Sequence, residues 1–161
     1  MAVLICLSVF SGCSGKLRTV EVRTSGFSAT AAVSCGEKSI TADFNIGLMG
    51  DMTATVLSPK SLEGMTVKWI GDKVTLSFLG IEKETDPQSL PYFNYASCIR
   101  DALLSIGESV TARKEENGYF YEGSCAKGDY TVLFRADGFP VTLCLPFAGV
   151  EVTFSDFEYI Y

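Results

Sequence analysis

Catalysis in this chain would have to rely on carboxylates, because its 161 residues include no histidine. Histidine is the usual general base near neutral pH and the commonest ligand of transition metals. Its absence excludes Ser-His-Asp and Cys-His catalysis and histidine-based zinc sites. Two acidic clusters, Glu115 with Glu116 and Asp156 with Glu158, have the residue types that glycosidases use. An Asn-Gly turn signal follows the first cluster, so a solvated turn accounts for it better. We expect no catalytic residues, and a carboxylate hydrolase is the weakest alternative.

Thiols are the second source of chemistry, since the chain contains six cysteines. Cys6 lies within the apolar start of the chain and Cys13 directly follows that segment. The body of the chain contains Cys35, Cys98, Cys125 and Cys144. Four cysteines allow two disulfides in three pairings, and export favours oxidation. Buried free thiols are the alternative, because cysteine is among the most buried residue types. No C-x₂-C pair exists, so we expect no metal site and no cofactor.

The first 12 residues have the character of an export signal. An unbroken apolar run ends in the small residues Ser11 and Gly12, directly before Cys13. The run is shorter than the roughly 20 residues that span a bilayer, and it fits the h-region and cleavage zone of a signal peptide. Residues 10–13, Phe-Ser-Gly-Cys, resemble the lipobox of bacterial lipoproteins. That resemblance implies that Cys13 receives a diacylglycerol and becomes the new N-terminus. The alternative is a buried N-terminal strand with an incidental cysteine.

A lipid on Cys13 would make the membrane the first partner of this chain. A diacylated cysteine carries two chains, and each buried CH₂ contributes about 0.8 kcal/mol, so attachment is stable. Residues 13–26 would then form a lipidated tether. The net charge of −6 and the scattered cations make nucleic acid a poor partner. We therefore expect an extracytoplasmic monomer, lipid-anchored to the cell membrane in the cell envelope, whose protein partner the sequence leaves undefined.

Strand signals dominate residues 27–161, which we expect to form one domain. In residues 39–46 apolar and polar side chains alternate with the period of two that is typical of a half-buried strand. Turn signals rich in Gly, Asn and Asp follow at near-regular spacing, and no long βαβ spacing interrupts them. This pattern predicts consecutive antiparallel pairing. The expected strands span residues 27–34, 39–46, 52–57, 65–70, 73–79, 110–114, 119–123, 130–135, 139–145 and 150–156.

One segment, residues 86–107, has a helical period instead. Its apolar residues recur at three- and four-residue spacing, and Gly107 stands at the stop position. The spacing predicts a helix near residues 89–106. The expected fold class is therefore mainly β (α+β). It comprises a single large twisted antiparallel sheet, a half-barrel, with one helix packed against its concave face.

Two stretches of the body resemble a known superfamily. Residues 53–73 run through a strand, Pro59, a second strand and a Gly-Asp turn, and residues 128–143 through a strand, an Asp-Gly turn and a strand with Pro140. This order resembles the lipoprotein-localisation carriers of the LolA and LolB type, and uncharacterised lipoproteins of Gram-positive bacteria. The resemblance covers residues 28–157. It implies a curved sheet around a helix, with a cavity between them for acyl chains or other apolar ligands.

Large apolar residues of the strands and the helix are the candidates for lining such a cavity. The candidates are Trp69, Leu76, Phe78, Phe93, Ile99 and Leu103. Their alternative role is to fill a solid core. We expect a non-enzymatic lipoprotein that binds an apolar or lipid ligand, or a partner, between sheet and helix. A surface interaction or assembly module with a solid core and no small-molecule ligand is the alternative. A cavity of about 300–1,000 Å³ would distinguish the two.

Overall fold

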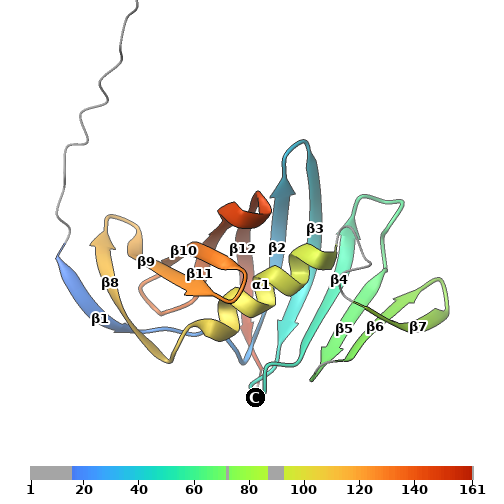
Figure 1. The fold of residues 1–161 in the computed structure, drawn as a ribbon, viewed down its shortest axis with the longest axis horizontal. Helices are drawn as coiled ribbons and strands as arrows, with labels where there is room; N and C mark the ends of the chain where they lie inside the picture. The colour runs from blue at the N-terminus through green and yellow to red at the C-terminus, as the bar shows by residue number, and fades with distance from the viewer. Residues whose placement is uncertain (1–15, 72, 87–92, 161) are drawn as a thin grey trace, which may run out of the picture.

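The strands form two successive antiparallel meanders in a computed structural model that describes residues 16–71, 73–86 and 93–160 (Figure 1). The first meander contains β2 (Phe27–Cys35), β3 (Lys38–Ile46), β4 (Met52–Ser58), β5 (Thr66–Ile70), β6 (Lys73–Phe78) and β7 (Ile81–Thr85). The second contains β8 (Ser109–Glu115), β9 (Gly118–Cys125), β10 (Gly128–Phe134), β11 (Pro140–Leu145) and β12 (Val150–Tyr159). A short strand, β1 (Leu17–Glu21), precedes both, and a 3-10 turn, η2 (Pro146–Ala148), separates β11 from β12.

All twelve strands belong to one sheet in the order β1-β8-β9-β10-β11-β12-β2-β3-β4-β5-β6-β7. The ladder between β12 and β2 joins the two meanders, with Phe154 opposite Ala31. β1 pairs with β8 at one edge, and β7 forms the other edge next to β6. The sheet is not closed into a barrel. Its two edges therefore lie at opposite ends of the molecule (Figure 1).

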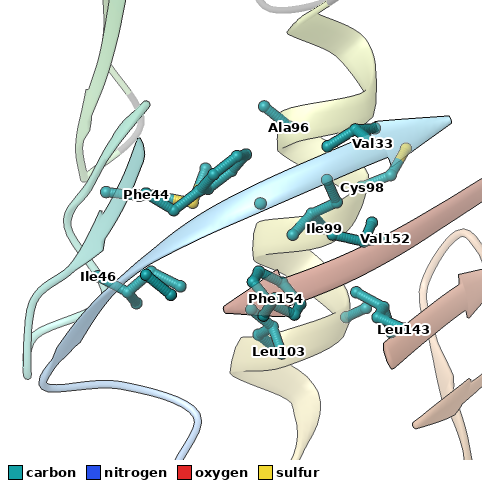
Figure 2. Close-up of a cluster of buried hydrophobic side chains, with 14 of the residues drawn as sticks. Val33, Phe44, Ile46, Ala96, Cys98, Ile99, Leu103, Leu143, Val152 and Phe154 are labelled. Atoms are coloured by element: carbon teal, nitrogen blue, oxygen red, sulfur yellow. The ribbon is translucent and has the colours of Figure 1, made fainter. Parts of the chain in front are cut away.

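Helix α1 (Phe93–Ser105) crosses the concave side of the sheet, where alternate residues of the central strands are buried (Figure 1). Its residues Ile99 and Leu103 are fully buried. Figure 2 shows them among side chains contributed by both meanders. These partners include Val33, Phe44, Ile46, Leu143, Val152 and Phe154. The helix face thus completes one hydrophobic core that neither meander could form alone.

The predicted fold class is confirmed, since one open antiparallel sheet is packed against one helix. Each strand that the alternation predicted is present, with bounds that differ by one to three residues at some ends. The predicted helix over residues 89–106 corresponds to α1 (Phe93–Ser105), and residues 89–92 lie outside the described part. The predicted signal peptide, residues 1–12, and Cys13 also lie outside it.

Two edge strands differ from the sequence predictions. Residues 13–26 were expected to form a tether, but within them Leu17–Glu21 form β1, paired with β8. Ile81–Thr85 form β7, which the sequence did not predict. Both strands are largely exposed on their two faces and carry charged side chains, as is typical of sheet edges. They therefore lack the apolar alternation that identified the inner strands.

Candidate functional site

The end of the sheet formed by β5, β6 and β7 presents a row of apolar side chains on its concave face. Trp69 stands opposite Val74, and Phe78 opposite Ile81, so each pair shares one face. Leu76 lies between Val74 and Phe78 on the same face, because alternate residues of a strand point the same way. We call Trp69, Leu76, Phe78 and Ile81 the apolar shelf.

Exposure rises across the apolar shelf from the core to the edge of the sheet. Trp69 is 3% exposed and belongs to the hydrophobic core. Leu76 and Phe78 are half-buried and pack against that core. Ile81, on the edge strand, is 73% exposed. The hydrophobic core therefore continues outward as an accessible apolar surface, which is the kind of surface that marks a binding site.

The candidate ligand-binding residues of helix α1 do not belong to the apolar shelf. Ile99 and Leu103 are enclosed in the core in Figure 2 and present no surface to solvent. The side chain of Phe93 lies outside the described part of the structure. The structure thus places Trp69, Leu76 and Phe78 together on one face, and Ile99 and Leu103 in the packed centre. A role in binding stays a prediction for all of them.

Four hollows lined by described residues lie away from the apolar shelf. Three are open surface hollows of about 500 to 740 Å³. The largest lies between β1, β8 and the turn before β11, and is lined by Glu21, Arg23, Glu108 and Asp137. The fourth, beside Tyr95 of α1, measures only about 10 Å³. None of these four has the apolar lining and the volume that an acyl chain would need.

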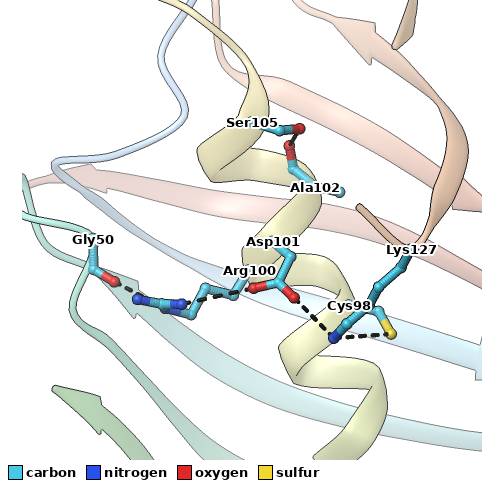
Figure 3. A network of polar contacts seen from close by, with 7 residues as sticks. All are labelled: Gly50, Cys98, Arg100, Asp101, Ala102, Ser105 and Lys127. Atoms are coloured by element: carbon cyan, nitrogen blue, oxygen red, sulfur yellow. Dashed lines mark hydrogen bonds and ion pairs between the residues drawn. The ribbon is translucent and has the colours of Figure 1, made fainter. Parts of the chain in front are cut away.

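A polar network anchors one flank of α1 (Figure 3). Lys127 Nζ lies 2.8 Å from Asp101 Oδ2 and 3.9 Å from Cys98 Sγ. Burial raises the pKa of the Cys98 thiol above its ordinary 9.0, although the Lys127 charge opposes that shift. Burial alone would lower the pKa of Lys127, but the hydrogen bond and charge of Asp101 outweigh it and raise that pKa above 10.5. Cys98 is therefore a protonated thiol at neutral pH, whereas a nucleophilic cysteine needs a lowered pKa.

Other contacts of α1 fix its position on the sheet. Arg100 Nε donates to the carbonyl oxygen of Gly50 at 3.0 Å, which ties the helix to the turn between β3 and β4 (Figure 3). Ser105 Oγ lies 2.8 Å from the hydroxyl of Tyr130 on β10. These bonds hold the helix to both meanders. Their role is to position the helix, because neither contact borders the small hollow beside Tyr95 that α1 lines.

Of the two alternatives for the cysteines of the domain, disulfides or free thiols, the structure shows free thiols. Cys35, Cys98, Cys125 and Cys144 are all free. Cys35 Sγ donates to the hydroxyl oxygen of Tyr95 at 3.1 Å. Within residues 16–71, 73–86 and 93–160, no three Cys, Asp or Glu side chains cluster as a metal site would require.

Sequence reasoning missed two side chains of this region, Ile81 and Lys83. Lys83 stands opposite Leu76 on the concave face and is exposed. Leu79 and Gly80 form the turn before β7, and an apolar residue on each side of a glycine turn is a hairpin signal. That signal could have identified Ile81. The charges at residues 82–84 obscured it.

No helix in the described part of the chain combines the length and the apolar character needed to cross a membrane. No protein-family model matches the chain, and no curated protein matches it.

Three solved structures are similar to this chain over most of its length. One is an uncharacterized conserved protein from Thermus thermophilus, with 13% identity, a TM-score of 0.47, and coverage of 84% of this chain and 79% of that one. A LolA superfamily protein from Nitrosomonas europaea has 7% identity and a TM-score of 0.48, with coverage of 88% and 89%. A DUF1329 family protein from Desulfovibrio piger has 16% identity and a TM-score of 0.38, with coverage of 84% and 86%.

One of these three structures is thus a LolA superfamily protein, the class of protein that residues 53–73 and 128–143 resemble. With TM-scores from 0.38 to 0.48, these similarities carry no functional conclusion.

Proposed function

We propose that this chain is a non-enzymatic, extracytoplasmic binding protein, anchored through a lipidated Cys13, that holds an apolar ligand against the apolar shelf. The observation that carries the proposal is the rising exposure from Trp69 through Leu76 and Phe78 to Ile81. In a domain with a solid core and no ligand, the apolar face of the sheet would end at the last strand whose side chains are buried. Here the apolar surface continues onto β6 and β7, beyond the side chains that the helix buries.

The energetics favour a ligand with a long hydrocarbon chain. Full burial of a Leu, Ile or Phe side chain contributes about 1.5–3 kcal/mol, and less when the side chain is already half-buried. Association costs at least about 4 kcal/mol in lost translational and rotational freedom. Three partly exposed side chains therefore bind a small apolar molecule only weakly. An acyl chain adds about 0.8 kcal/mol for each CH₂ group that it buries, so it overcomes that cost.

Lys83 suggests the polar end of such a ligand. Its ammonium-bearing side chain stands beside Leu76 on the concave face, and it forms no ion pair within the part of the chain that the structure describes. An anionic head group on the acyl chain would complement it. The ligand class that fits best is therefore a long-chain carboxylic acid or an acidic lipid.

Two observations support the absence of catalysis. The chain has no histidine, and its most enclosed thiol, Cys98, has a raised pKa. The chain therefore lacks a histidine base, and Cys98 lacks the lowered pKa of an activated nucleophile.

Trp69 provides a direct test, because it is the only tryptophan of the chain. The full chain carrying Cys13→Ala, which prevents acylation, is titrated with a bromine-labelled long-chain fatty acid while Trp69 fluorescence is recorded. Quenching that saturates supports the proposal. Phe78→Ser should weaken binding by about tenfold, since roughly 1–2 kcal/mol of apolar contact is lost. The matched control is Ile70→Ser, because Ile70 is 53% exposed on the neighbouring strand and lies on the opposite face from Trp69.

The interaction module with a solid core is the second candidate, and the complete burial of Ile99 and Leu103 favours it. It predicts no saturable quenching of Trp69 by any fatty acid. Equal effects of Phe78→Ser and Ile70→Ser would also reject binding at the apolar shelf and leave this second candidate.

A further inference from the structure

We infer that a basic corner of the sheet, formed by Lys16, Arg18 and Lys114, contacts an anionic lipid surface. The inference rests on the proposed anchoring through Cys13 and adds the face by which the domain meets the membrane. The partner is the head-group layer of a bilayer that contains acidic lipids.

The strand register gathers the three cations on one face. Leu17 stands opposite Arg113 and Arg18 opposite Ala112, and the Lys114 N–H donates to the carbonyl oxygen of Lys16 at 3.3 Å. Residues two apart on a strand share a face, and so do residues directly opposite. Lys16, Arg18 and Lys114 therefore lie on the face that carries the buried Ala112. All three side chains are exposed.

The charges of this corner are unbalanced. None of the three cations forms an ion pair with another described residue. The opposite face of the same strands is neutralised, because Arg113 pairs with Glu115 at 3.0 Å and lies over the ring of Phe120 at 4.7 Å. The chain as a whole has a net charge of −6. A local cluster of free cations on an acidic protein is complementary to an anionic surface.

The position of Cys13 brings this corner to the bilayer. Lys16 is three positions after Cys13, and three steps along the chain span at most about 10 Å. That reach is close to the Debye length of about 8–10 Å at physiological ionic strength. A lipid on Cys13 would thus hold the corner within electrostatic range of the head groups. Tyr119 stands opposite Lys114 and is half-buried, and tyrosine is a residue type that favours membrane interfaces.

This orientation has a consequence for the apolar shelf. β1 and β7 are the two edges of the sheet (Figure 1). Contact at β1 therefore holds the shelf at the end of the molecule farthest from the anchored edge, where it is free to receive a ligand.

The test uses the full chain, with the mass of the mature protein showing whether Cys13 carries a diacylglycerol. The lipidated chain is placed in vesicles of phosphatidylcholine alone or with added phosphatidylglycerol, and its amines are labelled with a small acylating reagent. We expect Lys16 and Lys114 to be labelled several-fold more slowly on the acidic vesicles. Lys60 and Lys68, in the other half of the sheet, should be unaffected, and high salt should abolish the protection. Equal labelling of Lys16 on both vesicles overturns the inference.

A mature mass without the lipid would refute the anchoring, and the corner is then tested by itself. The unlipidated chain is floated with the same two kinds of vesicle at low salt. Removing three cations that each contribute about fivefold should lower partitioning to acidic vesicles by roughly 100-fold. The variant is K16Q/R18Q/K114Q, and the control with the same charge change is K60Q/K68Q/K73Q. Equal losses in the two variants would show that net charge alone acts and would reject the basic corner.

Discussion

The hydroxyl oxygens of Ser105 and Tyr130 lie 2.8 Å apart, and this hydrogen bond joins the last turn of α1 to β10. Ser105 Oγ also donates to the carbonyl oxygen of Ala102 at 2.7 Å, so the Tyr130 hydroxyl donates to Ser105. The Tyr130 ring is buried. The bond is therefore one of the few polar links between the helix and the second meander.

Tyr130→Phe should lower the free energy of unfolding by about 1 kcal/mol, the net value of a typical hydrogen bond. Ser105→Ala should cost about 1–3 kcal/mol, because it removes the hydroxyl to which the phenol of Tyr130 donates. Urea unfolding of both single variants and the double variant gives the coupling between them. Strictly additive costs would show that the two hydroxyls do not interact.

Gly123 leaves space for the same tyrosine ring. A Cβ at this position would lie 2.6 Å from Cζ and Oη of Tyr130 and 2.8 Å from Cε1 of Tyr121. Gly123→Ala should therefore destabilise the fold by about 1–3 kcal/mol through overpacking. Gly107→Ala is the control, since its Cβ would meet nothing closer than 3.7 Å.

If the Cβ added by Gly123→Ala clashes with the Tyr130 ring, a smaller side chain at position 130 should relieve the clash. In a Tyr130→Leu background, Gly123→Ala should lose most of its cost, because the shorter side chain leaves room for the methyl group. An unchanged cost in that background would instead place the effect at Tyr121, whose Cε1 lies 2.8 Å from the same Cβ, or in the backbone of β9. The measurement is the thermal unfolding of the unchanged chain, Gly123→Ala, Tyr130→Leu and the double variant.

The two adjacent leucines of α1 separate core packing from surface contact. Leu103 is 0% exposed and Leu104 is 38% exposed. Leu103→Ala should cost about 2–5 kcal/mol, as for other buried leucines, and Leu104→Ala less than half as much. Similar costs in denaturant unfolding would mean that the helix does not present Leu103 to the sheet.

Cys98 and Lys127 predict a loss of stability at alkaline pH. Burial raises the pKa of Cys98 above 9.0 in the folded state, and the contacts with Asp101 raise that of Lys127 above 10.5. A group with a raised folded pKa contributes stability below its unfolded pKa and loses it as the pH rises toward the folded value. The free energy of unfolding should therefore fall above about pH 9, and Cys98→Ala should flatten the first part of that fall.

Thiol labelling provides an independent measurement of the same shift. Iodoacetamide should modify Cys98 more slowly than the half-exposed Cys144 in the folded chain. Lys127→Met should slow Cys98 further, because the lysine charge is what opposes the rise of its pKa. Faster labelling of Cys98 in that variant would instead indicate that Lys127 only shields the thiol.

The sequence predicted the inner strands and the helix because their apolar periods are strong. β3 alternates between buried and exposed residues from Ala42 to Ile46, and α1 places Ile99 and Leu103 one turn apart on its buried face. The edge strands β1 and β7 were missed since both faces of each meet solvent and charge replaces alternation. The strand order could not be predicted, because the pairing of β12 with β2 depends on which distant faces are complementary.

The candidate site was predictable only in part. Trp69, Leu76 and Phe78 were identified as large apolar residues of a hairpin, and period two places them on one face. Ile81 and Lys83 required knowledge of β7. The contact between Cys98 and Lys127 joins residues that are 29 positions apart, and no local pattern signals it.

The ladder between β12 and β2 also determines when this molecule can complete its fold. β2 emerges early during synthesis, yet one of its two neighbours is the last strand of the sheet. β1 likewise waits for β8, which follows the helix. Hairpins of the first meander can form at once, but the shared core needs both halves of the chain. A chain with this strand order can therefore complete its core only after β12, its last strand, is available to pair with β2.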